Sequence, residues 1–205
     1  MAVATARRPT PAAALPAGPA APERASGRGS SVVGMAVFVA ADAMLLVGLL
    51  AAYFGVRAEA FRWPPAGVHL DYYLPTMVTF TATLSAVSAG WAIHAVRWND
   101  RRHVLTALAL TAGFGLAMAN GLWFVDDRAG FAASTHAYAT LFLTLNVYNL
   151  VNIFVGIAVL FVAALRAGAG HLDRRDHDLL TVAVGFWEYV VVAWTTTFVI
   201  VWLFR

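Results

Sequence analysis

The sequence predicts an all-α fold: a polytopic membrane protein built as a bundle of five transmembrane helices. Its composition excludes an ordinary water-soluble domain, because apolar residues make up 60% of the 205 residues and charged residues only 12%. Soluble domains carry roughly 45–50% apolar and about 25% charged residues. The chain also contains five apolar stretches, each long enough to cross a hydrocarbon core of roughly 30 Å.

The chain divides into an arm and a membrane domain. Residues 1–30 are rich in Ala, Pro and Gly and show no helical or alternating pattern, so we expect a flexible cytoplasmic arm there. The membrane domain covers residues 31–205, with helices expected at 32–54, 74–96, 104–125, 137–165 and 179–204. A membrane β-barrel is not expected, because it would show alternating segments of about 10 residues.

The placement of arginines predicts the orientation in the membrane. All 14 basic residues are arginines; ten lie in the arm and in the second and fourth loops, and four lie on the other side. The positive-inside rule then places the N-terminus in the cytoplasm and the C-terminus outside. Since these arginines form no continuous block, nucleic-acid binding is not expected. Trp63, Trp98, Trp123 and Trp202 lie near expected helix ends, as in an aromatic belt.

Two carboxyl groups lie within the expected helices. Asp42 is in the middle of the first helix, and Glu188 is inside the fifth. A carboxylate at membrane depth costs roughly 2.5–3.5 kcal/mol on insertion scales, and no Arg or His lies at a matching depth. We therefore expect each carboxyl to be protonated, paired, or turned towards protein or water. Two interpretations stay open: a site for protons or lipid headgroups, or a neutral helix–helix hydrogen bond.

Three amides follow one side of the fourth expected helix: Asn146, Asn149 and Asn152. We interpret them as polar groups between helices, because amides are poor ligands for redox metals. The chain has no Cys, and of its six histidines only His94 falls within an expected helix, near its end. Haem ligation in a bundle needs His at depth, and copper needs several ligands close together. The sequence therefore predicts no catalytic residue, metal site or cofactor on this chain.

Small residues at four-residue spacing mark places where membrane helices approach closely. Two such rows occur, in the second and third expected helices: Ala82, Ala86 and Gly90, and Gly113, Ala117 and Gly121. We expect both rows to contact neighbouring helices. The other interpretation is that these are ordinary small residues facing lipid.

A set of motifs lies in the first two expected helices, in the loop between them and in the last helix. The residues are Ala40, Ala41, Asp42, Tyr53, Phe54 and Arg57, the Trp63-Pro64-Pro65-Ala66-Gly67 loop, Leu74 and Pro75, and later Phe186, Trp187, Trp194, Phe204 and Arg205. Together they resemble subunit III of the haem–copper oxidases. The resemblance covers residues 31–205.

The chain departs from that family at several positions. The acid of the first helix is usually Glu in the family and is Asp42 here. A His pair of the fourth helix is replaced by Asn149 and Asn152, and a His of the last helix by Glu188. A Glu late in the third helix appears as Trp123. The fold and the assembly role are therefore expected to carry over better than any proton or lipid site.

The resemblance implies an accessory subunit without haem or copper, in the inner membrane of a bacterial cell. Members pack against the catalytic subunit I, with subunit II in the same complex, and these partners hold the haem and copper. Members also bind phospholipid and sustain proton uptake and stability during turnover. Asp42 matches the family's buried acid. Arg57 and Trp63 match positions near lipid headgroups.

Other functions stay open at this point. The lost histidines would also suit an accessory subunit of a nitric oxide reductase. A proton-coupled transporter could use Asp42 and Glu188 as relays, although transporters usually show internal repeats and broken helices, and the chain shows neither. A third class is an assembly factor that forms no stable complex.

Overall fold

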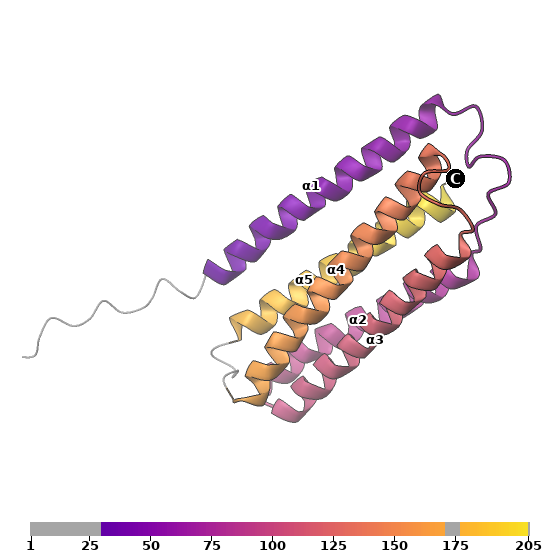
Figure 1. Cartoon of the computed structure of the whole chain (residues 1–205). Coiled ribbons are helices and arrows are strands. Elements are labelled where there is room, and N and C mark those ends of the chain that lie inside the picture. Colours follow the sequence, from indigo (N-terminus) through magenta and orange to yellow (C-terminus); the bar gives the residue numbers. More distant parts are fainter. Residues whose placement is uncertain (1–29, 171–176, 205) are drawn as a thin grey trace, which may run out of the picture.

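A computed structural model describes residues 30–170 and 177–204, and the regular structure in these ranges is helical (Figure 1). The elements are α1 (Ser30–Glu59), α2 (Tyr73–Arg97), α3 (Arg101–Arg128), α4 (Ala137–Gly168), α5 (Asp178–Phe198) and a terminal π-helical turn, η1 (Val199–Leu203). The expected arm lies outside the described residues, except for Ser30, where α1 begins.

The predicted fold class is confirmed. Each of the five helices is long and apolar enough to cross a membrane, with α5 and η1 forming one continuous span. Most of the helices extend a few residues beyond the apolar stretches, and α2 and α3 end in an arginine, Arg97 and Arg128. Such ends reach the polar edge of a bilayer, where a cation is well solvated and also complements the helix dipole.

The helices α2 and α3 form a tight antiparallel hairpin, and α5 packs against α1, α2 and α4 (Figure 1). The turn of the hairpin places Asn99 at a positive φ of 57°, a conformation that Asn tolerates better than most residues. Asp100 then caps α3, because its side chain accepts a hydrogen bond from the backbone N–H of His103 at 3.1 Å.

Two tryptophans of α5 fill the centre of the bundle. Trp187 and Trp194 are both fully buried. Their indole N–H groups donate across to α2, to Ser85 Oγ and Thr79 Oγ1 respectively, each at 3.1 Å. A buried indole N–H needs a partner, so these two bonds fix α5 against α2 as well as filling space.

Glycines make room for Trp187. A Cβ on Gly115 of α3 would lie 2.5 Å from Trp187 Cη2, and one on Gly156 of α4 would lie 2.8 Å from Trp187 Cε3. Both distances are too short for a real contact, so only glycine lets these two helices approach the indole.

The expected rows of small residues are only partly correct. Ala82 is buried, and Gly121 lies against Val78, where an added Cβ would be 2.5 Å from Val78 Cγ2. Gly90, Gly113 and Ala117, in contrast, are exposed on the outside of the bundle. Four-residue spacing drifts around a helix of 3.6 residues per turn. The row in α3 that meets a neighbour therefore runs through Gly115 instead.

The first helix is attached along a narrow strip. Only Leu46, Leu50 and Tyr53 of α1 are buried among the described residues, and they face α4 and α5. Figure 1 shows α1 on the opposite side of the bundle from the α2–α3 hairpin. Little apolar packing therefore attaches α1 to the other helices of this chain. Its polar contacts accordingly contribute a larger share of that attachment.

Candidate functional site: a carboxyl between three helices

Asp42 of α1 lies where α1, α4 and α5 meet. Its Oδ2 accepts hydrogen bonds from Tyr148 Oη of α4 at 2.5 Å and from Tyr189 Oη of α5 at 2.7 Å. The two hydroxyls are also only 2.8 Å apart, so either one can donate its single proton to the other in place of Asp42. One carboxyl oxygen and two phenols therefore close a three-membered network that links three helices.

The sequence of α1 explains why Asp42 points inwards. Residues four, eight and eleven positions later on a helix lie on the same face, and these positions are Leu46, Leu50 and Tyr53, the buried residues of α1. Asp42 extends this packing strip by one turn and is half-buried. The two phenols lie on the faces of α4 and α5 against which this strip of α1 packs.

The two phenols offset the cost of placing a carboxylate in the membrane. That cost is roughly 2.5–3.5 kcal/mol on insertion scales, whereas each hydrogen bond to a charged group contributes about 1.5–3 kcal/mol. Two such bonds are large enough to hold an ionised Asp42 at this depth. A protonated Asp42 would fit as well, because a phenol oxygen can also accept.

The three amides of α4 have different partners. Asn146 donates to Asp126 Oδ1 of α3 at 2.6 Å, and Asn149 donates to Thr197 Oγ1 of α5 at 3.1 Å. Asn152 donates within α4, to the backbone oxygen of Tyr148 at 3.3 Å. Two of the amides therefore bond to a neighbouring helix. The third, Asn152, bonds to the backbone of Tyr148, whose side chain belongs to the Asp42 network.

Arg57 and Trp63 lie together at one end of the bundle but face different groups. The guanidinium of Arg57 donates to the backbone oxygen of Phe204 and so joins the end of α1 to the C-terminal turn. The indole N–H of Trp63 donates to Tyr53 Oη at 2.9 Å, and the Trp63 ring packs edge-on against Tyr53 and Tyr138. Trp63 is half-buried, so part of its surface is used within the chain.

The comparison with known proteins decides the family. A family model described as cytochrome c oxidase subunit III matches residues 25–205. The chain belongs to the cytochrome c oxidase subunit III family. The resemblance inferred from the motifs of α1, the following loop and α5 is thereby confirmed.

Individual subunit III sequences are similar to the chain over most of its length. It is 25% identical over 177 residues to cytochrome c oxidase subunit 3 of Thermostichus vulcanus, covering 84% of the chain and 86% of that relative. The subunit 3 of Synechocystis sp. is 24% identical over 176 residues, covering 83% and 74%. The Sus scrofa subunit 3 is 25% identical over 173 residues, and the chain covers 66% of its length.

Glu188 does not join Asp42 in this subunit III chain. It is half-buried on α5, one position before Tyr189, and makes no hydrogen bond or ion pair within the described ranges. The two carboxyls expected to act alike therefore have different surroundings. Asp42 is held by two donors, whereas Glu188 faces away from the network, because neighbouring residues on a helix point about 100° apart.

The described residues offer no ligand set for a redox metal. Across residues 30–170 and 177–204, no three His, Asp, Glu or Cys side chains converge on one point. The fourth helix presents Asn149 and Asn152, and amides are poor ligands for haem iron or copper. The donor chemistry of this part of the chain therefore does not fit the redox groups of the oxidase.

Sequence reasoning missed Tyr148, Tyr189 and Asp126. The sequence offers no cationic side chain at the depth of Asp42, but a phenol O–H also donates to a carboxylate. Both tyrosines lie within the apolar stretches, so their hydroxyls are the signal in the sequence that points to this network. Asp126 gives no such signal in the sequence, because it lies close to the charged end of α3, where an acid is ordinarily solvated.

Proposed function

We propose that this chain is the accessory subunit III of a haem–copper cytochrome c oxidase, which reduces O2 with electrons from cytochrome c. The family match over residues 25–205, which includes all five membrane helices, is the observation that carries this function. The chain is then a non-catalytic member of an oxidoreductase complex in the aerobic respiratory chain.

The haem and copper belong to the partners in this proposal. The chain packs against catalytic subunit I, with subunit II in the same complex. The donor set described above supports this division, because haem iron in a bundle needs His at membrane depth. The described helices hold His only near their ends, His94 in α2 and His103 in α3. The chain contributes shape and polar groups instead of redox chemistry.

Asp42 is the residue through which we propose that the chain supports proton uptake. Its Oδ2 can bind or release a proton while the two phenols reorient, because the hydroxyls of Tyr148 and Tyr189 each donate and accept. The network thus stays hydrogen-bonded in either protonation state. Glu188, which has no partner in the described ranges, is proposed as a second proton- or lipid-related group.

The proposed membrane setting is the inner membrane of a bacterial cell, with the N-terminus in the cytoplasm and the C-terminus outside. The bias of arginines towards the arm and the α2–α3 and α4–α5 loops supports this orientation. Bound phospholipid is part of the proposal, with Arg57 and Trp63 near its headgroups. Arg57 bonds to the C-terminal turn and Trp63 bonds to Tyr53 near the end of α1, and this location at a helix end supports that placement.

The alternatives have less support. No observation on the chain favours a nitric oxide reductase over an oxidase, and the relatives named above are all cytochrome c oxidase subunits. A transporter is not favoured either, since the two candidate relay acids, Asp42 and Glu188, do not share a network.

Removal and restoration of the subunit test the proposal. Oxidase depleted of this chain should keep its haem absorption spectrum and its initial rate of O2 reduction, but lose activity over successive turnovers. Adding the purified chain should restore the lifetime. An altered haem spectrum after depletion, or a lifetime that does not depend on the chain, would contradict an accessory role.

A further inference from the structure

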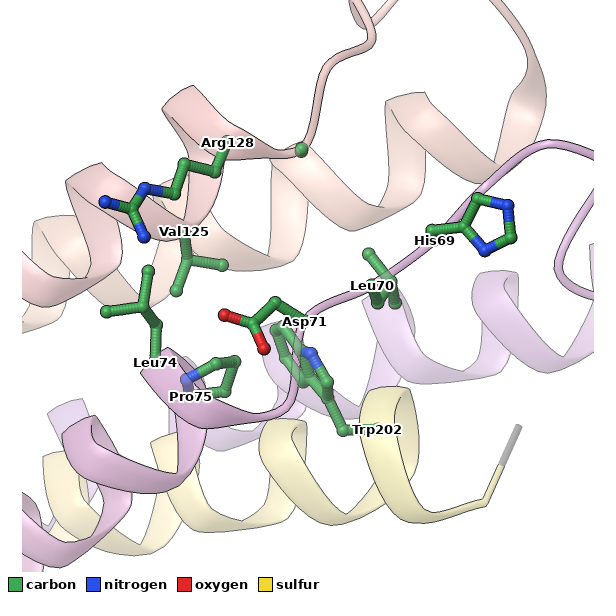
Figure 2. Close-up of a pocket in the computed structure, with 9 residues that line it drawn as sticks. His69, Leu70, Asp71, Leu74, Pro75, Val125, Arg128 and Trp202 are labelled. Carbon is green, nitrogen blue, oxygen red and sulfur yellow. The ribbon is translucent and has the colours of Figure 1, made fainter.

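A small cavity lies at the end of the bundle where α2 begins, α3 ends and η1 closes the chain (Figure 2). Its volume is ≈ 20 Å³. Apolar walls come from residues such as Leu74, Pro75 and Val125, and the polar groups come from His69, Asp71, Arg128 and Trp202. The cavity is therefore small and is lined by groups that can form hydrogen bonds.

Trp202 brings a buried donor to this cavity. Its side chain is only 1% exposed, and its indole Nε1–H has no hydrogen-bond partner in the described part of the chain. The two other fully buried tryptophans, Trp187 and Trp194, each donate to a hydroxyl. Since buried donors without partners are rare in native proteins, we expect the indole of Trp202 to have an acceptor other than the described residues.

The π-helical turn explains why Trp202 lies here. In η1 the backbone N–H of Phe204 donates to the oxygen of Val199 at 3.0 Å, a five-residue step. The wider turn shifts later side chains around the helix, and such turns often occur at functional positions. Trp202 thereby faces inwards, stacked on Phe198 with ring centroids 6.0 Å apart and packed against Phe142 at 5.4 Å. The packed ring cannot turn its N–H to solvent.

The acceptor that suits the cavity is Asp71. One of its carboxyl oxygens, Oδ1, accepts from the backbone N–H of Tyr73 at 3.0 Å, and a carboxylate has further acceptor positions. Figure 2 draws the Asp71 carboxyl and the Trp202 indole in the same pocket, with the Arg128 guanidinium beside it. No direct bond joins Asp71 to Trp202, so a link between these two lining residues would pass through a bridging molecule.

We propose that one ordered water occupies this cavity, accepts the Trp202 indole N–H and donates to the Asp71 carboxylate. A water needs about 10–15 Å³ of cavity measured with a water-sized probe and two to four polar partners, and this cavity provides both. Arg128 supplies a further donor at its rim. The water ties the C-terminal turn to the segment that precedes α2.

Larger or charged occupants fit less well. A phosphate group is several times larger than one water, and the Asp71 carboxylate would repel it. A metal ion would find only Asp71 and His69 as ligands among the lining residues, beside the donors Arg128 and Trp202. Both remain outcomes that the experiment distinguishes from a single water.

The direct test is a high-resolution electron cryo-microscopy map of the full chain in its oxidase complex. The expected result is one isolated density within hydrogen-bond distance of Trp202 Nε1 and of an Asp71 carboxyl oxygen. Density that extends beyond a single water, an empty cavity, or a direct bond between Asp71 and the indole would each overturn the proposal.

Variants at Asp71 provide an independent test. The quantity measured is the NMR chemical shift of the Trp202 indole proton, whose resonance is assigned with Trp202→Phe. Asp71→Leu removes the acceptor and should shift this resonance upfield, whereas Asp71→Asn keeps an oxygen acceptor and should leave it nearly unchanged. The Trp187 and Trp194 resonances report that the bundle is folded and should not move. Equal behaviour of the two Asp71 variants would contradict the water bridge.

Discussion

At the scale of single residues, Asp42 depends on the hydroxyls of Tyr148 and Tyr189 for its place among α1, α4 and α5. The same network holds α1, which buries only Leu46, Leu50 and Tyr53. Under the proposed function Asp42 also supports proton uptake, so replacing it should affect both the attachment of α1 and activity during turnover.

We predict that Asp42→Asn shortens the lifetime of oxidase activity during turnover without shifting the haem spectrum. The amide keeps one acceptor oxygen but loses the charge, which weakens its hydrogen bonds by about 1–2 kcal/mol. The measurement is O2 consumption over successive turnovers together with absorption spectra. Glu59→Gln, at the exposed end of α1, is the matched control and should behave as wild type. A changed haem spectrum in the Asp42 variant would count against an accessory role.

At the scale of elements, close contact of α3 and α4 with Trp187 depends on glycine. We predict that Gly115→Ala lowers the free energy of unfolding by about 1–3 kcal/mol, as overpacked cores do, because the new Cβ would lie 2.5 Å from Trp187 Cη2. Gly113→Ala, where nothing lies within 4 Å of the new Cβ, should be neutral or stabilising by up to about 1 kcal/mol. Denaturant unfolding of the detergent-solubilised chain measures both, and equal effects would contradict the packing described here.

The α2–α3 hairpin carries a pH-dependent cap. The backbone N–H of His103, and then its ring, hydrogen-bond to Asp100 and hold the pKa of that carboxyl below its ordinary value. A carboxyl with a lowered pKa in the folded state stabilises it above the unfolded pKa of about 3.9. This contribution is lost as the pH falls through the lowered folded pKa.

We therefore predict that the thermal midpoint of the wild type falls more steeply below about pH 4 than that of Asp100→Asn. The Asn variant keeps an N-cap oxygen at every pH but cannot titrate. Thermal scans between neutral and acidic pH measure the difference. Parallel curves for the two proteins would show that the Asp100 cap does not titrate as described.

At the scale of the whole molecule, the absence of Cys from the sequence allows the orientation to be tested with single substitutions. Ala132 lies in the exposed loop before α4, and Ala169 is exposed just after α4, so the two positions flank one membrane helix. We predict that Ala132→Cys reacts with a membrane-impermeant maleimide from outside, and that Ala169→Cys reacts only after permeabilisation. The reverse pattern would contradict the positive-inside assignment.

Much of this fold could be predicted from the sequence, because the length of an apolar stretch and the arginines around it are local properties. Which face of a helix meets which neighbour is not local. The row through Gly113 and Ala117 had the expected spacing, yet Gly115 is the residue that meets Trp187. Trp202, expected in an outer aromatic belt, is buried, because a π-helical turn changes the facing of the last residues.

The candidate site was predictable to a similar degree. Asp42 stands out in any apolar stretch, because an acid at membrane depth is costly. Its partners, Tyr148 and Tyr189, do not stand out in the sequence, because tyrosine is ordinary in membrane helices. Only the packing of α4 and α5 shows that both bond to one carboxyl oxygen. The contact depends on three helices that are distant in sequence, and no local pattern encodes it.

Purification of the full chain from native membranes in mild detergent, with haem and copper counted for each separated subunit, tests the central claim most directly. The chain should migrate in constant ratio with a large haem-bearing subunit, and after separation it should carry neither haem nor copper. A chain that migrates alone, or that retains a stoichiometric redox metal after separation, would contradict its assignment as an accessory subunit of the oxidase.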